Sequence, residues 1–142
     1  MESSQVKQVL VVASKTATSA RLMQAIDRRA ATGPCQFTLL VPDAKDGENA
    51  NRTLKAALPA MRRAAGSPVK GLVGGPDPFE AVQDAVREGA FDEIIVSTLP
   101  KRASRWLRRD LISRVEGLGL PVTPVVPKVV RDPTAGIGGI PG

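Results

Sequence analysis

Short apolar runs alternate with longer segments of helical periodicity along this chain, and this alternation limits its possible folds more than any other feature. It is clearest between residues 91 and 126. Residues 94–96 form a β-branched run without polar alternation, which is typical of a strand covered on both faces. Apolar residues then recur at helical spacing over 103–118, and a second apolar strand follows at 122–126. Because strand, helix and strand in this order form a right-handed crossover, the segment predicts parallel strands.

The same alternation extends over the rest of the chain. We therefore predict a doubly wound α/β domain, with one open parallel five-stranded sheet and helices on both faces. Its expected extent is 1–127, and 128–142 read as a flexible tail because Pro and Gly are frequent there. The expected strands are 9–13, 37–41, 69–73, 94–96 and 122–126, and the expected helices centre on 22–30, 54–61, 79–86 and 103–118.

Local signals mark where several of these helices begin, end or bend. Asp77 is a predicted N-cap before a proline at the first helical position. Asn49 or Asn51 is expected to cap the preceding helix, and Pro59 is expected to kink or break it. Gly119 is expected to close the last helix in a left-handed conformation.

The composition excludes most catalytic chemistry. The 142 residues include no histidine and one cysteine, Cys35. A Ser-His-Asp or Cys-His pair and a His-based zinc site are therefore excluded, and we expect no enzyme activity, metal or cofactor. Cys35 begins an apolar run and is predicted to be a small core residue in a reducing cytoplasm. We see no signal peptide and no apolar run near the ~20 residues of a membrane span, so a cytoplasmic protein is expected.

The positive charge is concentrated in one segment. The whole chain has a net charge of +6, and residues 101–114 carry +5 of it. Arg102, Arg105 and Arg109 lie on one side of the expected helix, where they form either a phosphate clamp or a solvated face. Asp110 and Arg114 are spaced for an intrahelical ion pair. The segment lacks interleaved aromatic residues, so we expect only weak, salt-sensitive and non-specific affinity for nucleic acid.

The chain resembles the universal stress protein family over residues 6–127. The resemblance rests on VLVVAS at the first strand, GGPDPFEAV at the third helix, and DEIIVS followed by a basic helix and LPVTPVV. It implies the strand order 3-2-1-4-5, a ligand crevice between the first and fourth strands, and frequent dimers through the fifth.

The family's ATP-binding loop is altered in this sequence. ATP-binding members resemble one another in a Gly-x-x-Gly and a later Gly-Ser or Gly-Thr after the fourth strand, and in an Asp at the end of the first. Here Pro100, Ala103 and Arg109 fall near the glycine positions, and Ala13-Ser14 supplies no Asp. Without glycines the backbone cannot closely approach phosphate oxygens, so we expect a variant without tight ATP binding.

Candidate contacts for a small anion or nucleotide are expected at the carboxyl ends of strands and in the basic loop. The candidates are Ser14, Lys15, Val41, Ser97, Thr98, Arg102, Ser104, Arg105 and Arg109. Ser14, Ser97 and Thr98 can donate hydrogen bonds, but no base is expected near them. The leading interpretation is a stress-associated binding or regulatory module without catalytic machinery. The alternative is a nucleotide-binding protein with slow hydrolysis that uses the diverged basic loop; a weaker one is an anion or nucleic-acid binder acting through the basic helix.

Assembly is expected at the last strand. Pro121, Pro124 and Pro127 favour an edge position there, since proline cannot donate to a ladder. An apolar edge is a ready pairing surface, and we expect a homodimer through it. The expected contacts are Val122, Thr123, Pro124, Val125 and Val126.

Overall fold

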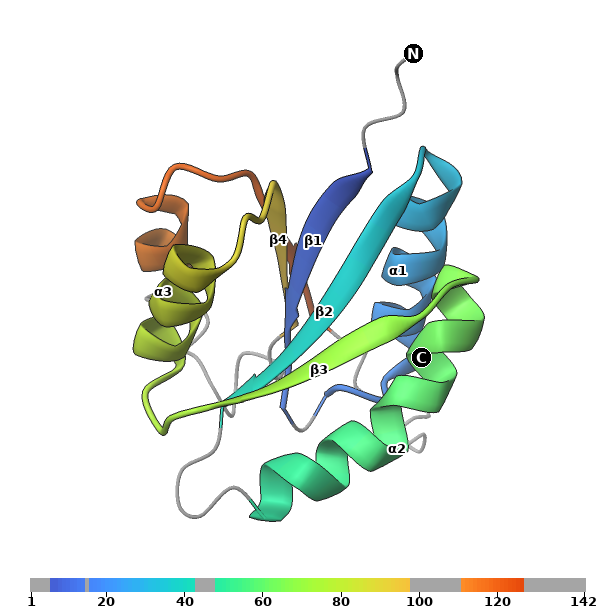
Figure 1. Ribbon diagram of the computed structural model, residues 1–142, viewed down its shortest axis with the longest axis horizontal. Helices are drawn as coiled ribbons and strands as arrows, with labels where there is room; N and C mark the ends of the chain where they lie inside the picture. Colours follow the sequence, from blue (N-terminus) through green and yellow to red (C-terminus); the bar gives the residue numbers. More distant parts are fainter. Residues whose placement is uncertain (1–5, 15, 43–47, 98–110, 127–142) are drawn as a thin grey trace, which may run out of the picture.

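The computed structural model of the chain describes residues 6–14, 16–42, 48–97 and 111–126. These residues form one five-stranded sheet with helices between successive strands (Figure 1). Residues 111–116, just before the last strand, are helical as well. In chain order the other elements are β1 (Lys7–Val12), α1 (Ala20–Ala31), β2 (Cys35–Pro42), α2 (Glu48–Ala65), β3 (Val69–Gly74), α3 (Pro78–Glu88), β4 (Glu93–Ser97) and β5 (Val122–Val125).

The sheet has the order β3-β2-β1-β4-β5, and every pair of neighbouring strands is parallel. β1 is central, because Val11 pairs with Leu39 of β2 on one side and with Ile95 of β4 on the other. β3 and β5 are the two edges among the described residues. The predicted fold class, strand order and edge position of the last strand are therefore confirmed.

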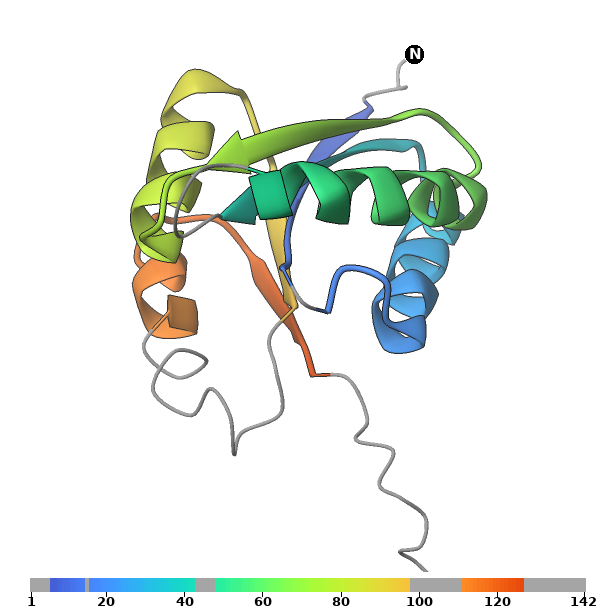
Figure 2. The ribbon, with the colours of Figure 1, turned by 90° about the horizontal axis from the view of Figure 1, so that it is seen from below.

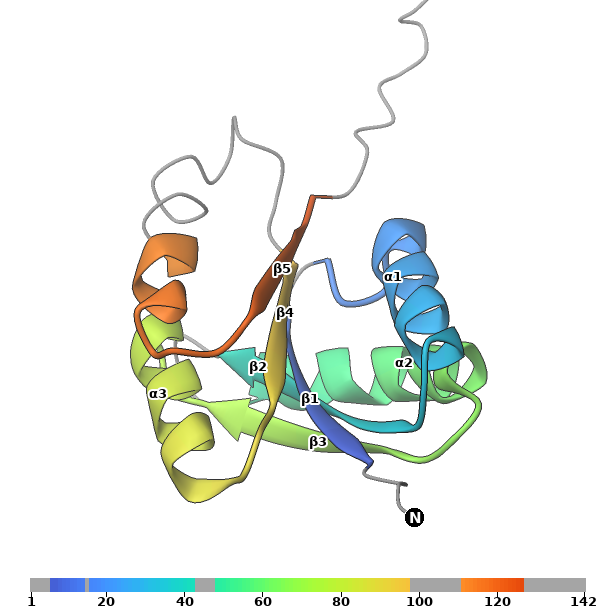
Figure 3. The same ribbon diagram turned by 90° about the horizontal axis from the view of Figure 1, so that it is seen from above.

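Helices cover both faces of the sheet. Figure 3 shows α1 and α2 on one side, with α3 and the helical residues 111–116 on the other. Successive residues of a strand point to opposite faces, so β1 contributes to two cores. Val9 and Val11 pack in the core beneath α1 and α2, whereas Leu10 and Val12 pack in the core beneath α3.

The cap signals around α3 and before β5 are confirmed. The Asp77 carboxylate accepts hydrogen bonds from the backbone N–H groups of Phe79 at 2.9 Å and Glu80 at 3.2 Å. Gly119 has a φ of 92°, the left-handed conformation that favours glycine at the end of a helix. Arg114 stacks over the Phe79 ring at 4.2 Å from its centroid, which joins residues 111–116 to α3.

The predicted N-cap of α2 is wrong. The helix begins at Glu48, so Asn49 and Asn51 lie inside it and neither is its N-cap. Of the kink or break expected at Pro59, the break does not occur, because α2 continues through this residue. Pro59 removes the partner of the Lys55 carbonyl, but both residues are exposed, so water can bind that oxygen.

Candidate functional site

The strand order reverses between β1 and β4. The chain builds the sheet outward from β1 to β2 and β3, and then returns to the other side of β1 to place β4 and β5. Open α/β sheets bind ligands at such a point, outside the carboxyl ends of the strands. The candidate site is therefore where β1 and β4 end.

The chain leaves β1 through two successive tight turns. The backbone N–H of Ala17 donates to the Ser14 carbonyl at 3.0 Å, and the N–H of Ser19 donates to the Thr16 carbonyl at 3.0 Å. The Ser19 hydroxyl then caps α1 by accepting from the N–H of Leu22 at 3.1 Å. Figure 2 shows this loop beside the end of β4 before it enters α1. The first turn of α1 contains no acidic residue, and the positive end of the helix dipole favours an anion at this edge.

A buried pair of hydroxyls joins this loop to β4. The Thr16 and Ser97 side-chain oxygens are 2.7 Å apart, although the residues are 81 positions apart in the chain. Thr16 is 7% exposed and Ser97 6% exposed. Whichever hydroxyl donates to the other, the acceptor keeps its own hydrogen, which can be donated to a further acceptor. The pair thus fixes the loop and holds one polar hydrogen at the point where the strand order reverses.

The predicted site residues fall in three different environments. Ser14 is exposed at the end of β1, next to the pair, whereas Ser97 is a member of the pair. Val41, near the end of β2, is 1% exposed and packs in the core beneath α1 and α2. Ser14 and Ser97 are thus brought to the same edge, whereas Val41 is a core residue. The other candidates, Lys15, Thr98, Arg102, Ser104, Arg105 and Arg109, lie outside the described residues, as do Lys101, Trp106 and Asp110.

Sequence reasoning missed Thr16. It is one of three hydroxyl residues between positions 16 and 19, and this local pattern indicates only a polar turn with candidates for a helix cap. Nothing in the local pattern distinguishes a buried hydroxyl from an exposed one. Once β1 is placed beside β4, the buried Ser97 becomes the signal, because a buried hydroxyl needs a polar partner and the loop after β1 is the nearest source of one.

Solved structures with a similar fold are known. The chain is similar to a universal stress protein crystallised in complex with cAMP, with a TM-score of 0.66 and 18% identity over 88% of this chain and 100% of that one. It is also similar to a universal stress protein from Archaeoglobus fulgidus, with a TM-score of 0.61 and 17% identity over 84% and 93%. The chain has the universal stress protein fold. The Archaeoglobus fulgidus protein in complex with dAMP gives a TM-score of 0.59 at 18% identity, covering 85% of this chain and 98% of that one.

Comparison of sequences, unlike comparison of structures, finds no match for this chain. No protein-family profile matches it, and no curated protein matches it either. The resemblance inferred from the order of strands, caps and turns is thus confirmed at the level of the fold.

The opposite, amino-terminal end of the sheet carries an ion pair. Arg29 of α1 binds Glu93 of β4 through two hydrogen bonds of 2.7 and 3.1 Å. The hydrogen bond to Glu93 raises the pKa of Arg29, because it stabilises the protonated guanidinium. Asp92 accepts from the backbone N–H of Gln8 at 2.7 Å. Cys35 is only half-buried here beside the core, and burial raises the pKa of its thiol. These contacts connect α1, β1 and β4, which is a structural role.

The expected dimer residues differ widely in exposure. Val125 is 6% exposed and packs in the core beneath α1 and α2, so it is not available to a partner. Thr123 and Pro124 are exposed, and Val122 and Val126 are half-buried. Only the middle of β5 can therefore contribute much side-chain surface to an interface.

Two further classes of site were sought in the described residues. They contain no group of three or more His, Cys, Asp or Glu side chains that could hold a metal ion. No helix among them is both long and apolar enough to cross a membrane.

Proposed function

We propose that this protein is a universal-stress-protein-like binding module of the stress response that acts without catalysis. Its ligand is a small anion, such as a nucleoside monophosphate, held weakly at the carboxyl ends of β1 and β4. The observation that carries the proposal is the buried Thr16–Ser97 pair. It keeps one hydroxyl hydrogen available at this edge and fixes the loop that leads into α1. The complexes with cAMP and dAMP of proteins with this fold support the ligand class.

A triphosphate is expected to bind poorly. Pro100, Ala103 and Arg109 stand where glycines would let the backbone approach phosphate oxygens. Each lost backbone donor costs about 1–3 kcal/mol if the ligand still desolvates it, whereas an exposed charge pair contributes about 0.5–1 kcal/mol. Two or three such losses outweigh the added arginine charge and lower affinity by roughly 10²–10⁴-fold.

The alternative is tight ATP binding through the basic loop, with Arg102, Arg105 and Arg109 replacing the lost backbone donors. The concentration of charge in 101–114 favours it, because guanidinium groups bind phosphate through paired donors. ATP retained by the purified protein would distinguish this alternative from weak binding.

Isothermal titration with AMP, cAMP and Mg-ATP tests the proposal. We expect a dissociation constant on the order of 0.1–1 mM for a monophosphate, and none of about 10 μM or tighter for Mg-ATP. Tight Mg-ATP binding would establish the alternative, and Arg102→Ala would then show whether arginine replaces the glycines. If no monophosphate binds at several millimolar, the proposed ligand class is wrong.

Two substitutions locate the ligand. Thr16→Val and Ser97→Ala each remove one hydroxyl of the pair, and we expect each to weaken monophosphate binding about fivefold or more. Thr123→Val is the matched control, since Thr123 is an exposed hydroxyl residue on β5. Equal losses in all three variants would place the ligand elsewhere.

We also propose a homodimer along β5, supported by its edge position and by the exposed Thr123 and Pro124. Pro124 withholds one backbone donor, so side-chain packing must contribute more than a continuous ladder.

A further inference from the structure

The other edge of the sheet, β3, exposes apolar side chains on both of its faces. Leu72 is 41% exposed and Val73 is 43% exposed, and they are two of the three exposed large hydrophobic residues in the described chain. Neighbouring residues of a strand point to opposite faces, so one lies on the α3 side of the sheet and the other on the α2 side. From Lys70 to Val73 every residue of β3 is exposed.

The backbone of this edge is also open to pairing. β3 pairs with β2 on one side, and no described strand lies beyond it (Figure 1). An edge strand presents a row of N–H and C=O groups that another chain can bind. β3 contains no proline, so none of its donors is missing.

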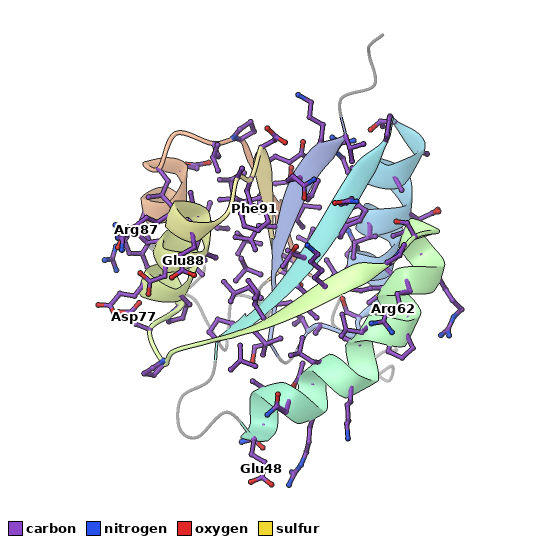
Figure 4. All side chains as sticks on the ribbon, viewed as in Figure 1. Glu48, Arg62, Asp77, Arg87, Glu88 and Phe91 are labelled. Atoms are coloured by element: carbon purple, nitrogen blue, oxygen red, sulfur yellow. The ribbon has the colours of Figure 1, made fainter. Side chains whose placement is uncertain are left out.

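Three cations surround this edge. Lys70 lies on β3 itself and is exposed. Lys55 and Arg62 lie on the same side of α2 as Leu58. Lys55 is three residues before Leu58 and Arg62 is four residues after it, and residues at these spacings are neighbours on a helix. Leu58 covers β3, since its side chain lies 3.3 Å from where a Cβ on Gly71 would be. Figure 4 shows Arg62 extending from α2 next to β3.

Within the part of the chain that the structure describes, neither β3 nor its neighbour β2 carries an acid that could balance these cations. Residues 66–76 include no Asp or Glu, and neither does β2. The acid at the start of α2, Glu48, is in an ion pair with Arg52 at 3.7 Å. Among the described residues, the β3 edge therefore combines unpaired backbone groups, two apolar side chains and an excess of positive charge.

We propose that the β3 edge binds an extended acidic segment of another protein by strand addition. The added strand pairs with the outer backbone groups of β3, its apolar residues cover Leu72 and Val73, and its carboxylates lie near Lys55, Arg62 and Lys70. Main-chain pairing of this kind supplies affinity, and the alternating side chains supply specificity. This surface is separate from the ligand site of the proposed function and does not depend on it.

Charge argues against the other possible occupants. A second copy joined along β3 would bring Lys55, Arg62 and Lys70 of both copies to one interface, where like charges repel. The chain's own residues 127–142 carry Lys128 and Arg131 against Asp132, so they do not complement the edge either. An acidic segment is the occupant whose charge fits.

The test uses the full chain and a fluorescein-labelled decapeptide in which Glu or Asp alternates with Val, followed by fluorescence anisotropy. We expect saturable binding that weakens at least fivefold between about 50 and 200 mM salt, because the cations are exposed. A decapeptide in which Lys alternates with Val should not bind. The acidic peptide with alternate backbone amides N-methylated keeps its charge but loses its donors, so it should bind at least tenfold more weakly.

Neighbouring arginines on α2 provide a matched pair of variants. Arg62→Glu reverses a charge beside β3 and should weaken the acidic peptide about five- to tenfold. Arg63→Glu makes the same change one residue away, on another side of the helix, and should change binding less than about twofold. Both residues are exposed, so both variants should fold like the parent chain.

Several results would overturn the proposal. Equal losses in Arg62→Glu and Arg63→Glu, or unchanged binding of the N-methylated peptide, would mean that general basicity attracts the peptide. Absence of binding at about 1 mM peptide would reject the site. Self-association of the chain that disappears in Leu72→Glu would assign the edge to a second copy instead.

Discussion

β3 and β5 are both edge strands of one parallel sheet, yet they limit pairing in different ways. β5 contains Pro124 and turns Val125 into the core, so little beyond Thr123 and Pro124 is presented to solvent. β3 keeps all its backbone donors and exposes Leu72 and Val73, but is surrounded by cations. Proline limits every partner that pairs by backbone, whereas charge excludes only partners of the same sign. The β5 edge thus suits a packed contact, and the β3 edge suits a partner selected by charge.

The largest difference between the edges should appear when the same change is made in each. Val125→Lys places a cation in the core, and we expect it to lower the free energy of unfolding by about 3 kcal/mol or more. Val73→Lys is the matched change on β3, where the side chain is 43% exposed, and should cost less than about 0.5 kcal/mol. Urea denaturation of both variants measures the contrast. Similar losses at the two positions would show that the edges do not differ in burial.

A smaller effect should show that β3, although exposed, is tightly packed where it ends. A Cβ on Gly74 would lie 2.5 Å from the Cβ of Ala81 in α3, and neither short side chain can turn away. We expect Gly74→Ala to destabilise the protein by about 1–3 kcal/mol in the same assay. Gly75→Ala is the control, because nothing lies within 4 Å of the added carbon. A neutral Gly74→Ala would mean that α3 does not fix the end of β3.

The smallest expected effect concerns the dimer proposed along β5. Thr123→Glu puts like charges across that interface, and we expect it to weaken dimerisation about tenfold without unfolding an exposed position. Leu72→Glu on β3 should leave the dimer unchanged. Sedimentation velocity over a range of concentrations measures both variants. A monomeric parent chain, or dissociation by Leu72→Glu alone, would contradict pairing through β5.

Much of the fold could be predicted because its signals are local. Asp77, Pro78 and Glu80 mark the start of α3 within four residues, and Gly119 marks a helix end by itself. The strand order came from the resemblance, and that order already placed β3 at an edge. The segment 69–73 predicts a strand, but its sequence does not indicate that Leu72 and Val73 are 41% and 43% exposed. Periodicity predicts that a strand exists, and only the packing shows which faces are covered.

The site was less predictable because it depends on contacts between distant residues. Ser97 was selected for its position at the end of a strand, whereas Thr16, its partner 81 residues away, was not. The capping prediction at Asn49 and Asn51 failed although its signal was local. A local preference for asparagine was overridden when α2 began at Glu48.

The central position of β1 has a consequence for synthesis. Val12 pairs with Leu40 on one side, but its other neighbour, Val96, follows it by 84 residues. On a ribosome that adds about 5–20 residues per second, one flank of β1 waits roughly 4–17 seconds for β4. During that time the nascent chain can assemble β1, β2 and β3 with α1 and α2, while an apolar edge stays open. Newly made copies are therefore most exposed to aggregation before their second half emerges, and substitutions that slow the arrival of β4 should lower soluble yield without changing the finished fold.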